Sequence, residues 1–241
     1  MSPCFVDYQI DDDACLALIY TWKRYEIVKE SIESMMEEPG YPLRLWVIDN
    51  GNDDGTREYL LQKVYDGAIE KLIIEKRNWG IHHALNQWRA LMKITSENPK
   101  IPMPKYCLIT NDDMQYKPNW LKECVDTYED LKRSPYEISI VSPFHCRHLD
   151  GNYAKGMTPG EYWEDYPIST YVSGNCNFME TKIFLDALDY PTAHPTEGGD
   201  WALLEYFKSK GYKCARTKEE MVSHRPETQG GGKYNFLFHW T

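Results

Sequence analysis

The stretch that decides the fold is KYCLITNDDMQYKPNW, which spans Lys105–Trp120. It begins with a short apolar run, Tyr106–Ile109, of the length expected for a buried strand. The run stops at Asn111, which two adjacent carboxylates follow. Pro118 then opens a segment with apolar residues at helical spacing, because proline favours the first turn of a helix. The stretch predicts a strand, a polar strand end and a helix.

The two carboxylates at this strand end are Asp112 and Asp113. Placing such a pair at the end of a buried strand is costly unless a cation lies there. Oxygen ligands suit a hard divalent ion, magnesium or manganese, that holds a diphosphate. An isolated NDD also fits an Asn-Asp turn that caps the next helix. The rest of the chain has to decide between these two interpretations.

Composition limits the class of partner. At 241 residues the chain is one large domain or two small ones, and a hydrophobic fraction of 42% can fill a core. Aromatic residues make up 14%, and surplus exposed aromatic rings are common in proteins that stack on sugars. The net charge of −10 argues against a nucleic acid as partner. It leaves room for a nucleotide, whose charge a metal can neutralise.

Targeting and cysteine signals point to a cytoplasmic protein. The N-terminal residues lack the basic and apolar regions of a secretory signal, and no apolar run has the length of a transmembrane span. The seven cysteines are scattered without a CxxC pair, which predicts reduced thiols. His145, Cys146 and His148 could indicate zinc, but a fourth ligand at usable spacing is missing, so a surface loop is favoured.

Strand and helix signals alternate along the first half of the chain. Apolar runs predict strands at Cys15–Tyr20, Leu43–Ile48, Ile69–Glu75, Tyr106–Ile109 and Ile138–Val141. Helical spacing predicts helices at Glu26–Glu38, Thr56–Tyr65 and Ile81–Thr95, with a further helix after Pro118. This alternation predicts an α/β fold with a parallel, doubly wound sheet.

Polar residues follow four of these strands: Thr21 and Trp22, Asp49, Asn78, and the Asp112–Asp113 pair. In doubly wound sheets ligands bind outside the carboxyl ends of the strands, so these side chains are expected to meet at one site. The sequence contains neither GxGxxG after the first strand nor GxxxxGK[ST]. Without these phosphate-binding loops a metal is left to hold a phosphate group.

The pattern changes after about residue 142. Ser169–Glu180 predicts a strand, a glycine turn and a second strand. Helices are expected from Thr181 to about Leu188 and over Asp200–Lys210, with a final strand at Tyr212–Arg216. The polar residues 1–13 are expected to form a loose arm or edge. No internal repeat or clear linker divides the chain, which favours one domain.

Five motifs occur in an order that is typical of one enzyme family: TWKR (21–24), VIDNGNDDGT (47–56), NWGIHHALNQ (78–87), LITNDDM (108–114) and SGNCNFM (173–179). With them the chain resembles the nucleotide-sugar-dependent glycosyltransferases of the GT-A fold, specifically glycosyltransferase family 2, over about residues 15–224. The resemblance implies a Rossmann-like GT-A fold with a mostly parallel central sheet flanked by helices. It implies a single domain over 1–241, with a nucleotide-sugar-binding half (about 15–141), an acceptor and catalytic half (about 142–224) and a flexible C-terminal lid (225–241).

The resemblance places a divalent metal, Mn or Mg, at LITNDDM. Asp113 is expected to be the metal ligand, with Asn111 or Asp112 at the ribose or at a metal-bound water. Two adjacent like charges repel each other, which gives the pair a physical reason to bind a cation. His224 resembles the late histidine that completes metal coordination in such enzymes. A purely structural role for His224 is the alternative.

The remaining donor-side expectations concern the first three strand ends. Asp49 is expected to accept a hydrogen bond from the nucleobase, with a turn cap as the alternative. Thr21 and Trp22 are expected to hold the base, Trp22 by stacking, although Trp22 could also be a plain core residue. Asn78 is placed on the donor side as well, where bracing its own loop is the more probable role.

Asp200 is the expected catalytic base. A late family motif aligns on Gly211 and puts its base eleven residues earlier, at Asp200, although Gly199 and Ala202 replace two of its acidic residues. Such a base deprotonates an acceptor hydroxyl as it attacks the anomeric carbon, which inverts the configuration. The alternative is that Asp200 caps a helix, and Glu197 would then be the next candidate.

Acceptor contacts are expected from Trp163, Tyr171 and Asn175, with a glycan or glycoconjugate as the acceptor. The predicted function is metal-dependent transfer of a sugar from a nucleoside-diphosphate sugar to an acceptor hydroxyl. A nucleotidyltransferase is one alternative, but it would need a Gly-rich loop bearing Lys or Arg after the first strand. A non-catalytic nucleotide-sugar-binding module is the other, which the altered motif around Asp200 keeps open.

Overall fold

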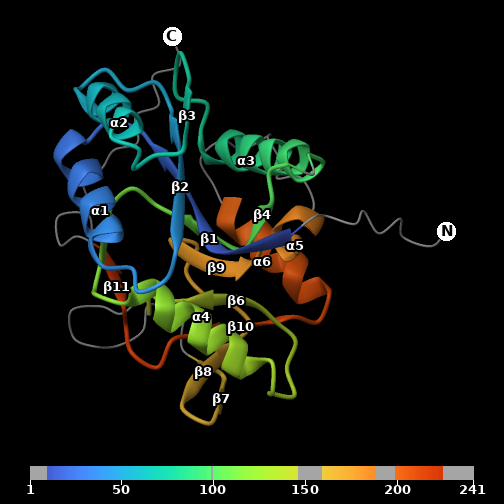
Figure 1. Ribbon diagram of the computed structural model, residues 1–241. Coiled ribbons are helices and arrows are strands. Elements are labelled where there is room, and N and C mark those ends of the chain that lie inside the picture. Colours follow the sequence, from blue (N-terminus) through green and yellow to red (C-terminus); the bar gives the residue numbers. More distant parts are fainter. Residues whose placement is uncertain (1–9, 99, 146–158, 188–198, 225–241) are drawn as a thin grey trace.

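The structure is a computed structural model that describes residues 10–98, 100–145, 159–187 and 199–224, with the backbone alone for 10–12 and 199–201. In these ranges the chain forms a nine-stranded sheet with helices packed on both faces (Figure 1). A smaller sheet of two strands lies beside it.

The bounds of the elements are as follows. The strands of the large sheet are β1 (Ile10–Thr21), β2 (Leu43–Asp49), β3 (Lys71–Ile74), β4 (Met103–Thr110), β6 (Ile138–Ser142), β7 (Glu161–Trp163), β8 (Tyr166–Ser169), β9 (Cys176–Glu180) and β10 (Lys213–Arg216). The small sheet consists of β5 (Met114–Tyr116) and β11 (Val222–His224). The helices are α1 (Tyr25–Glu37), α2 (Thr56–Tyr65), α3 (Ile81–Ser96), α4 (Trp120–Leu131), α5 (Thr181–Asp186) and α6 (Gly199–Ser209).

All strands and helices expected from the apolar runs and helical spacing are present, with shifted ends. The expectation of a loose arm over residues 1–13 is wrong for its last part, because β1 begins at Ile10, which pairs with Met103 of β4. Residues 1–9 lie outside the described ranges. Three short strands, β5, β7 and β11, were not expected. Each has only three residues, too few for a periodic pattern to show.

The strand order is β3-β2-β1-β4-β9-β6-β10-β8-β7. The half formed by β3, β2, β1 and β4 is parallel throughout, whereas β9 runs antiparallel to both β4 and β6. The sheet is therefore mixed, and the α/β fold with a largely parallel first half is confirmed. Because β2 and β4 lie on opposite sides of β1, the chain changes winding direction at β1, and ligands of such sheets bind at the carboxyl ends next to this point.

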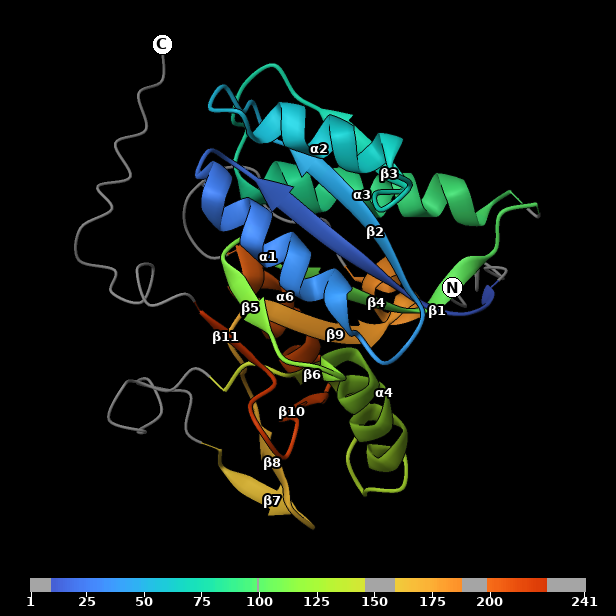
Figure 2. The ribbon, with the colours of Figure 1, turned by 60° about the vertical axis from the view of Figure 1, so that its left-hand side comes forward.

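Each face of the sheet has its own apolar core. Alternation along β1 sends Cys15 and Ala17 to the face covered by α1, α2 and α4, and Leu16 and Leu18 to the face covered by α3, α5 and α6. Figure 2 shows α1 and α4 on the near face of the sheet, with α6 behind it. Because β1 is buried on both faces, it reads as a continuous apolar run.

The end of the described chain returns to the middle of the fold. β11 pairs antiparallel with β5, and His224 lies opposite Met114 (Figure 2). The hairpin of β7 and β8 lies at the other end of the large sheet. Five strand pairings separate β7 from β4, which corresponds to about 24 Å at about 4.8 Å between neighbouring strands.

Candidate active site

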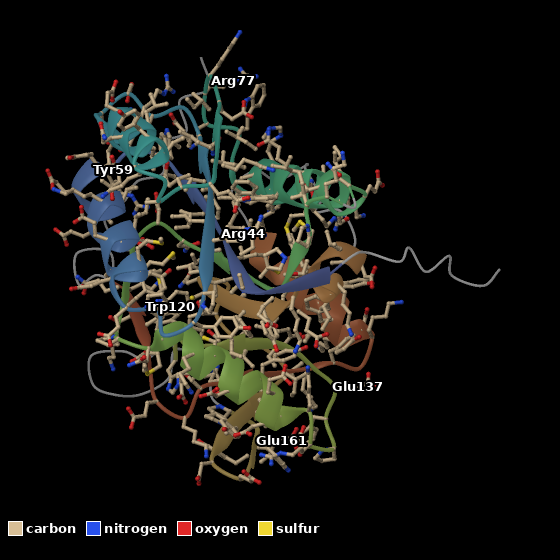
Figure 3. The ribbon with its side chains drawn as sticks, in the orientation of Figure 1. Arg44, Tyr59, Arg77, Trp120, Glu137 and Glu161 are labelled. Atoms are coloured by element: carbon tan, nitrogen blue, oxygen red, sulfur yellow. The ribbon has the colours of Figure 1, made fainter. Side chains whose placement is uncertain are left out.

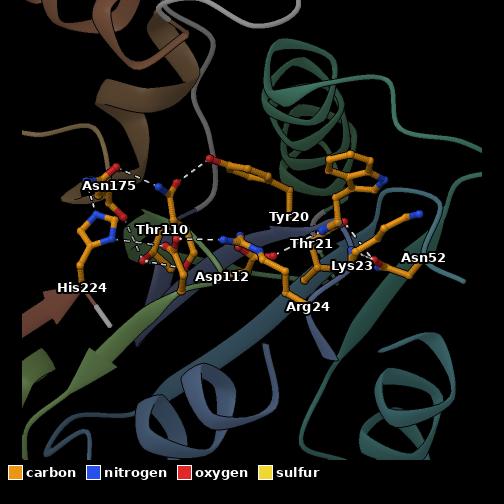
Figure 4. A network of polar contacts seen from close by, with 12 residues as sticks. Tyr20, Thr21, Lys23, Arg24, Asn52, Thr110, Asp112, Asn175 and His224 are labelled. Atoms are coloured by element: carbon orange, nitrogen blue, oxygen red, sulfur yellow. Dashed lines mark hydrogen bonds and ion pairs between the residues drawn. The ribbon is translucent and has the colours of Figure 1, made fainter. Parts of the chain in front are cut away.

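Three loops meet at the carboxyl edge of the sheet, after β1, β2 and β4 (Figure 4). Thr21 is fully buried at the end of β1, and its Oγ1 accepts a 2.7 Å hydrogen bond from Asn52 Nδ2. The backbone N–H of Lys23 donates to Asn52 Oδ1. The backbone N–H of Trp22 donates to Asp112 Oδ2 over 3.3 Å. The strand ends of β1, β2 and β4 thus form one polar site.

Arg24 bridges the two carboxylates that follow β4. Its Nη2 lies 2.5 Å from Asp112 Oδ1, and its Nη1 lies 3.2 Å from Asp113 Oδ2. The backbone of Lys23 and Arg24 has positive φ angles of 62° and 66°, a left-handed conformation that is uncommon outside glycine. Strain of this kind is concentrated at functional sites, because the surrounding structure has to hold it in place.

Asp113 has one carboxylate oxygen without a hydrogen-bond partner. Its Oδ1 is buried and accepts no hydrogen bond from the residues that the structure describes. The nearest charged group on that side is His224, whose Nδ1 lies 3.8 Å from Asp113 Oδ1. A buried carboxylate oxygen is costly to leave unpaired, so this position is suited to a ligand.

His224 lies between Asp113 and an aromatic ring. The ring of Phe144 meets it edge to face, with centroids 5.0 Å apart. Burial lowers the pKa of His224 and nearby Arg24 lowers it further, while Asp113 opposes the shift. The lowered pKa favours the neutral imidazole at neutral pH, the form that ligates metals.

A relay of hydrogen bonds runs from the back of His224 to β1 (Figure 4). His224 Nε2 lies 2.5 Å from Asn175 Nδ2, and Asn175 Oδ1 accepts a 2.8 Å bond from Asn111 Nδ2. Asn111 Oδ1 accepts a 2.5 Å bond from the Tyr20 hydroxyl. Four side chains from three strand ends and β11 therefore fix the orientation of the imidazole.

Asp112 shows how much negative charge the site holds. Burial raises its pKa to about 7, with a further contribution from the neighbouring charge of Asp113, while Arg24 lowers it. The single guanidinium therefore does not offset the burial of both carboxylates. An additional cation would favour their ionised forms.

The donor set fits a divalent ion such as Mn²⁺ or Mg²⁺. Metal–ligand bonds of about 2 Å to an oxygen and a nitrogen allow one ion to contact both Asp113 Oδ1 and His224 Nδ1 across their 3.8 Å separation. Among the described residues, no group of three or more His, Cys, Asp or Glu side chains could hold a metal. An ion at this position therefore needs further oxygen ligands from a phosphate or water, the usual arrangement for Mg²⁺.

Asp49 and Thr21 are engaged inside the protein. Asp49 is fully buried, its Oδ1 accepts bonds from the N–H groups of Gly51 and Asn52, and its Oδ2 pairs with Arg57 Nε at 2.6 Å. These contacts are those of the turn-cap alternative. A hydrogen bond from a nucleobase to Asp49 stays a prediction. Thr21 supports the loop through its bond from Asn52.

Trp22 and Asn78 differ in what they leave available. Trp22 is half-buried, whereas Trp46, Trp88 and Trp120 are fully buried, so the plain-core alternative does not describe it. Asn78 Oδ1 accepts bonds from Asn50 Nδ2 and the backbone N–H of Gly80. This is the loop-bracing role that was weighed for Asn78.

The expected acceptor residues do not gather at one place. The Tyr171 hydroxyl donates to Glu205 of α6 over 2.5 Å. Trp163 lies on the outermost strand, β7, stacked on Tyr166. Asn175 lies in the relay behind His224 and not on an acceptor surface. Acceptor contacts by Trp163 and Tyr171 stay predictions.

Several expected features lie partly or wholly outside the described residues. Asp200 is in the first turn of α6, which begins one residue earlier, and its side chain is not described. The alternative candidate Glu197, the lid over 225–241, and Cys146 and His148 of the considered zinc site are outside as well.

Sequence reasoning missed four residues of the site: Tyr20, Arg24, Asn52 and Arg57. Arg24 and Asn52 lie inside motifs that had been recognised, TWKR and VIDNGNDDGT, so their positions in the chain were a signal. Their roles depend on contacts between loops that are far apart in the sequence. Tyr20 ends an apolar run and reads as a core residue, although its hydroxyl reaches Asn111.

The α/β sheet with a carboxylate pair at its winding switch defines a protein of the GT-A class, as the structural comparisons confirm. The chain belongs to glycosyl transferase family 2, whose sequence profile matches residues 17–185. Over 229 residues it is 24% identical to a protein of Haloferax volcanii described as a glucosyl-dolichyl phosphate glucuronosyltransferase, covering 86% of this chain and 66% of that protein. The family and fold expected from the motifs are confirmed.

Two solved structures share the fold. The mannosyltransferase PcManGT from Pyrobaculum calidifontis, in complex with GDP-Man and Mn²⁺, has a TM-score of 0.66 and 15% identity, over 93% of this chain and 62% of that one. GalNAc-T7 with UDP, GalNAc and Mn²⁺ has a TM-score of 0.63 and 12% identity, over 88% of this chain and 42% of that one. The chain spans about two thirds or less of the length of these relatives.

Proposed function

We propose that the chain is a metal-dependent, inverting glycosyltransferase of the hexosyltransferase type, which moves a sugar from a nucleoside-diphosphate sugar to an acceptor hydroxyl. The observation that carries this proposal is the unpartnered, buried Oδ1 of Asp113, which faces the neutral imidazole of His224 at the carboxyl edge of the sheet. Family membership and two neighbours solved with Mn²⁺ and a nucleotide or nucleotide sugar support it.

Asp113 and His224 would hold Mn²⁺ or Mg²⁺. When bound, the ion would supply positive charge to the departing nucleoside diphosphate. The loops after β1, β2 and β4 would position the donor around it. The half-buried ring of Trp22 is available to stack on the base. Asn52 and Asp49 would keep the β2 loop in place through their bonds to the β1 loop and to Arg57.

Asp200 would take the proton from the acceptor hydroxyl. It lies at the start of α6, and this helix contacts Tyr171 through Glu205. A carboxylate in the first helical turn is stabilised by the helix dipole, which favours its ionised form. An acceptor approaching along Tyr171 would reach the start of α6, where Asp200 lies.

The donor sugar and nucleobase can be narrowed only by analogy. The Haloferax volcanii relative is described as a glucuronosyltransferase, and the two structural neighbours were solved with GDP-Man and with UDP and GalNAc. UDP- and GDP-linked hexoses are therefore the donors to test first, with a glycan or glycoconjugate as acceptor.

Thermal unfolding with UDP, GDP and their hexose conjugates tests the proposal, each with Mn²⁺ or with EDTA. A ligand at 100 times its Kd stabilises a protein by about 2.7 kcal/mol, so a donor should raise the Tm clearly when Mn²⁺ is present and much less with EDTA. Transfer by the hit donor should then give a product of inverted configuration by NMR. If none of these ligands raises the Tm with Mn²⁺, the proposed function is wrong.

The same assay separates the alternatives. A non-catalytic binding module would bind the donor but release no nucleoside diphosphate over hours. A nucleotidyltransferase would form pyrophosphate from a sugar phosphate and a nucleoside triphosphate. The structure describes no helix long and apolar enough to cross a membrane in the residues it covers. A cytoplasmic location is part of the proposal, supported by the free thiols of the described cysteines, Cys15, Cys107, Cys124, Cys176 and Cys214.

A further inference from the structure

The Arg24 guanidinium occupies the one place where a positive charge contacts both carboxylates of the site. One nitrogen is bonded to each, Nη2 to Asp112 and Nη1 to Asp113. The other oxygen of Asp113, Oδ1, faces His224 and is the metal position proposed above. A metal at Oδ1 and the guanidinium at Oδ2 would therefore share one carboxylate.

We propose that Arg24 is a built-in counter-ion that competes with the divalent metal for Asp112 and Asp113, so that the metal binds together with the donor diphosphate and only weakly by itself. The inference rests on the proposed function, because it takes Asp113 as a metal ligand. It assigns a role to a residue for which the motif TWKR gave none.

Charge balance is the first argument. The two carboxylates carry two negative charges and Arg24 carries one positive charge, while His224 is kept neutral by burial. A divalent ion added alone would leave the site with one positive charge in excess, at short distance from the guanidinium. Like charges in a partly buried site disfavour each other. A diphosphate removes the excess, since its oxygens bind both the ion and a guanidinium.

Accessibility is the second argument. The Arg24 side chain is 31% exposed, whereas those of Asp112 and Asp113 are 5% and 10% exposed. The guanidinium therefore covers the carboxylates from the solvent side. It can move away toward solvent without disturbing the apolar core beneath.

The backbone at Arg24 is the third argument. Its carbonyl accepts bonds from the N–H groups of Ile27 and Val28 at the start of α1, 2.9 and 3.0 Å long. Lys23, just before it, is held by Asn52. Both residues are kept in the left-handed conformation by these bonds. The main chain is thus fixed, and exchange between carboxylate and phosphate needs only a rotation of the Arg24 side chain.

Mn²⁺ affinity without any nucleotide tests this role, measured by the EPR signal of free Mn²⁺ in titrations of the full chain. Arg24→Met removes the charge and keeps an unbranched side chain. We expect it to bind Mn²⁺ alone at least 10-fold more tightly than the natural protein. Adding UDP, or GDP in parallel, should tighten Mn²⁺ binding strongly in the natural protein and less in the variant.

Two further variants make the result decisive. Arg44→Met is the matched control: Arg44 forms a two-pronged pair with Glu70 at the amino end of β2 (Figure 3), so its loss should leave Mn²⁺ affinity unchanged. Arg24→Lys keeps a charge that cannot offer two parallel N–H groups, and an intermediate affinity is expected. It decides the question if Arg24→Met does not fold.

The outcomes are distinguishable from a failure of the proposed function. If Mn²⁺ binds with UDP or GDP, but Arg24→Met, or Arg24→Lys where the former is unfolded, binds Mn²⁺ alone no more tightly than the natural protein, the competition is refuted while the function stands. If the natural protein binds no Mn²⁺ with either nucleotide, the proposed metal site and this inference fail together.

Discussion

His224 Nδ1 lies 3.8 Å from Asp113 Oδ1, although one residue follows the fourth strand and the other ends the last described strand. The pairing of β11 with β5 brings them together, because it sets His224 opposite Met114, the neighbour of Asp113. The candidate metal position therefore exists only when β11 is in place. Its two protein ligands depend on a sheet of two three-residue strands.

Loss of either ligand should weaken metal-dependent nucleotide binding while the fold stays intact. Outer partners of metal ligands are worth about 10- to 100-fold in affinity, so Asp113→Asn should cost about 100-fold or more, and His224→Ala a smaller amount. Calorimetric titration of UDP and GDP, with Mn²⁺ and with EDTA, measures this. Asp126→Asn, an exposed carboxylate on α4 paired with Lys122, is the control. Unchanged Mn²⁺-dependent binding in folded Asp113→Asn would remove this residue from the metal site.

The relay behind His224 should tune the metal site from a distance. A metal at Nδ1 requires the proton on Nε2, so Asn175 has to present its carbonyl oxygen to Nε2, and Asn111 and the Tyr20 hydroxyl have to turn with it. Removing such a partner typically costs 10- to 100-fold in metal affinity. Asn175→Ala should fall in this range, and Tyr20→Phe should lose less.

The imidazole ¹⁵N chemical shifts of His224 check this relay directly, since they report which ring nitrogen carries the proton. They should change on adding Mg²⁺ with UDP or GDP in the natural protein, and this response should be reduced in Asn175→Ala. Tyr59→Phe removes a hydroxyl from a distant helix, α2, and is the control (Figure 3). Equal metal affinity in Asn175→Ala and the natural protein would mean that the relay only supports the fold.

Asp112 should make the metal-free protein less stable as the pH rises. Burial raises its pKa to about 7 in the folded protein, while the unfolded chain releases this proton near pH 4. Between these values the folded state holds a proton that the unfolded state has lost, so stability falls as the pH increases. In EDTA, the Tm of the natural protein should drop between about pH 4 and 7 relative to that of Asp112→Asn. Parallel Tm curves for the two proteins would contradict the raised pKa.

Much of the first half of the fold could be predicted because its signals are local. Apolar runs mark β1, β2 and β4, and the turn residues that follow them mark the strand ends. The position of Asp112 and Asp113 at the site follows from the doubly wound topology alone. These features need no knowledge of which distant residues pair.

The parts that failed depend on pairings between distant segments. Asn175 was expected at the acceptor, but β9 runs antiparallel to β4 with Cys176 opposite Thr110, which sets Asn175 beside Asn111. Arg24 reads in the sequence as a solvated loop charge, and only the contact with two buried carboxylates reveals its role. Arg57, which pairs with Asp49, gave no signal for the same reason.

Asp200 separates catalysis from mere binding, and it is the residue that the family resemblance supports and the described side chains leave open. Its place in the first turn of α6 is fixed. Asp200→Asn keeps the size of the side chain but cannot accept the proton of an acceptor hydroxyl. It should keep Tm and donor affinity and lose transfer by about 100-fold or more, the usual scale for removing a general base. Asp186→Asn, an exposed carboxylate at the end of α5, is the control and should transfer normally. Transfer at a near-normal rate by Asp200→Asn would leave this residue only a structural role at the start of α6, and Glu197 would be the next base to replace. A product of retained configuration would exclude a single displacement assisted by either carboxylate.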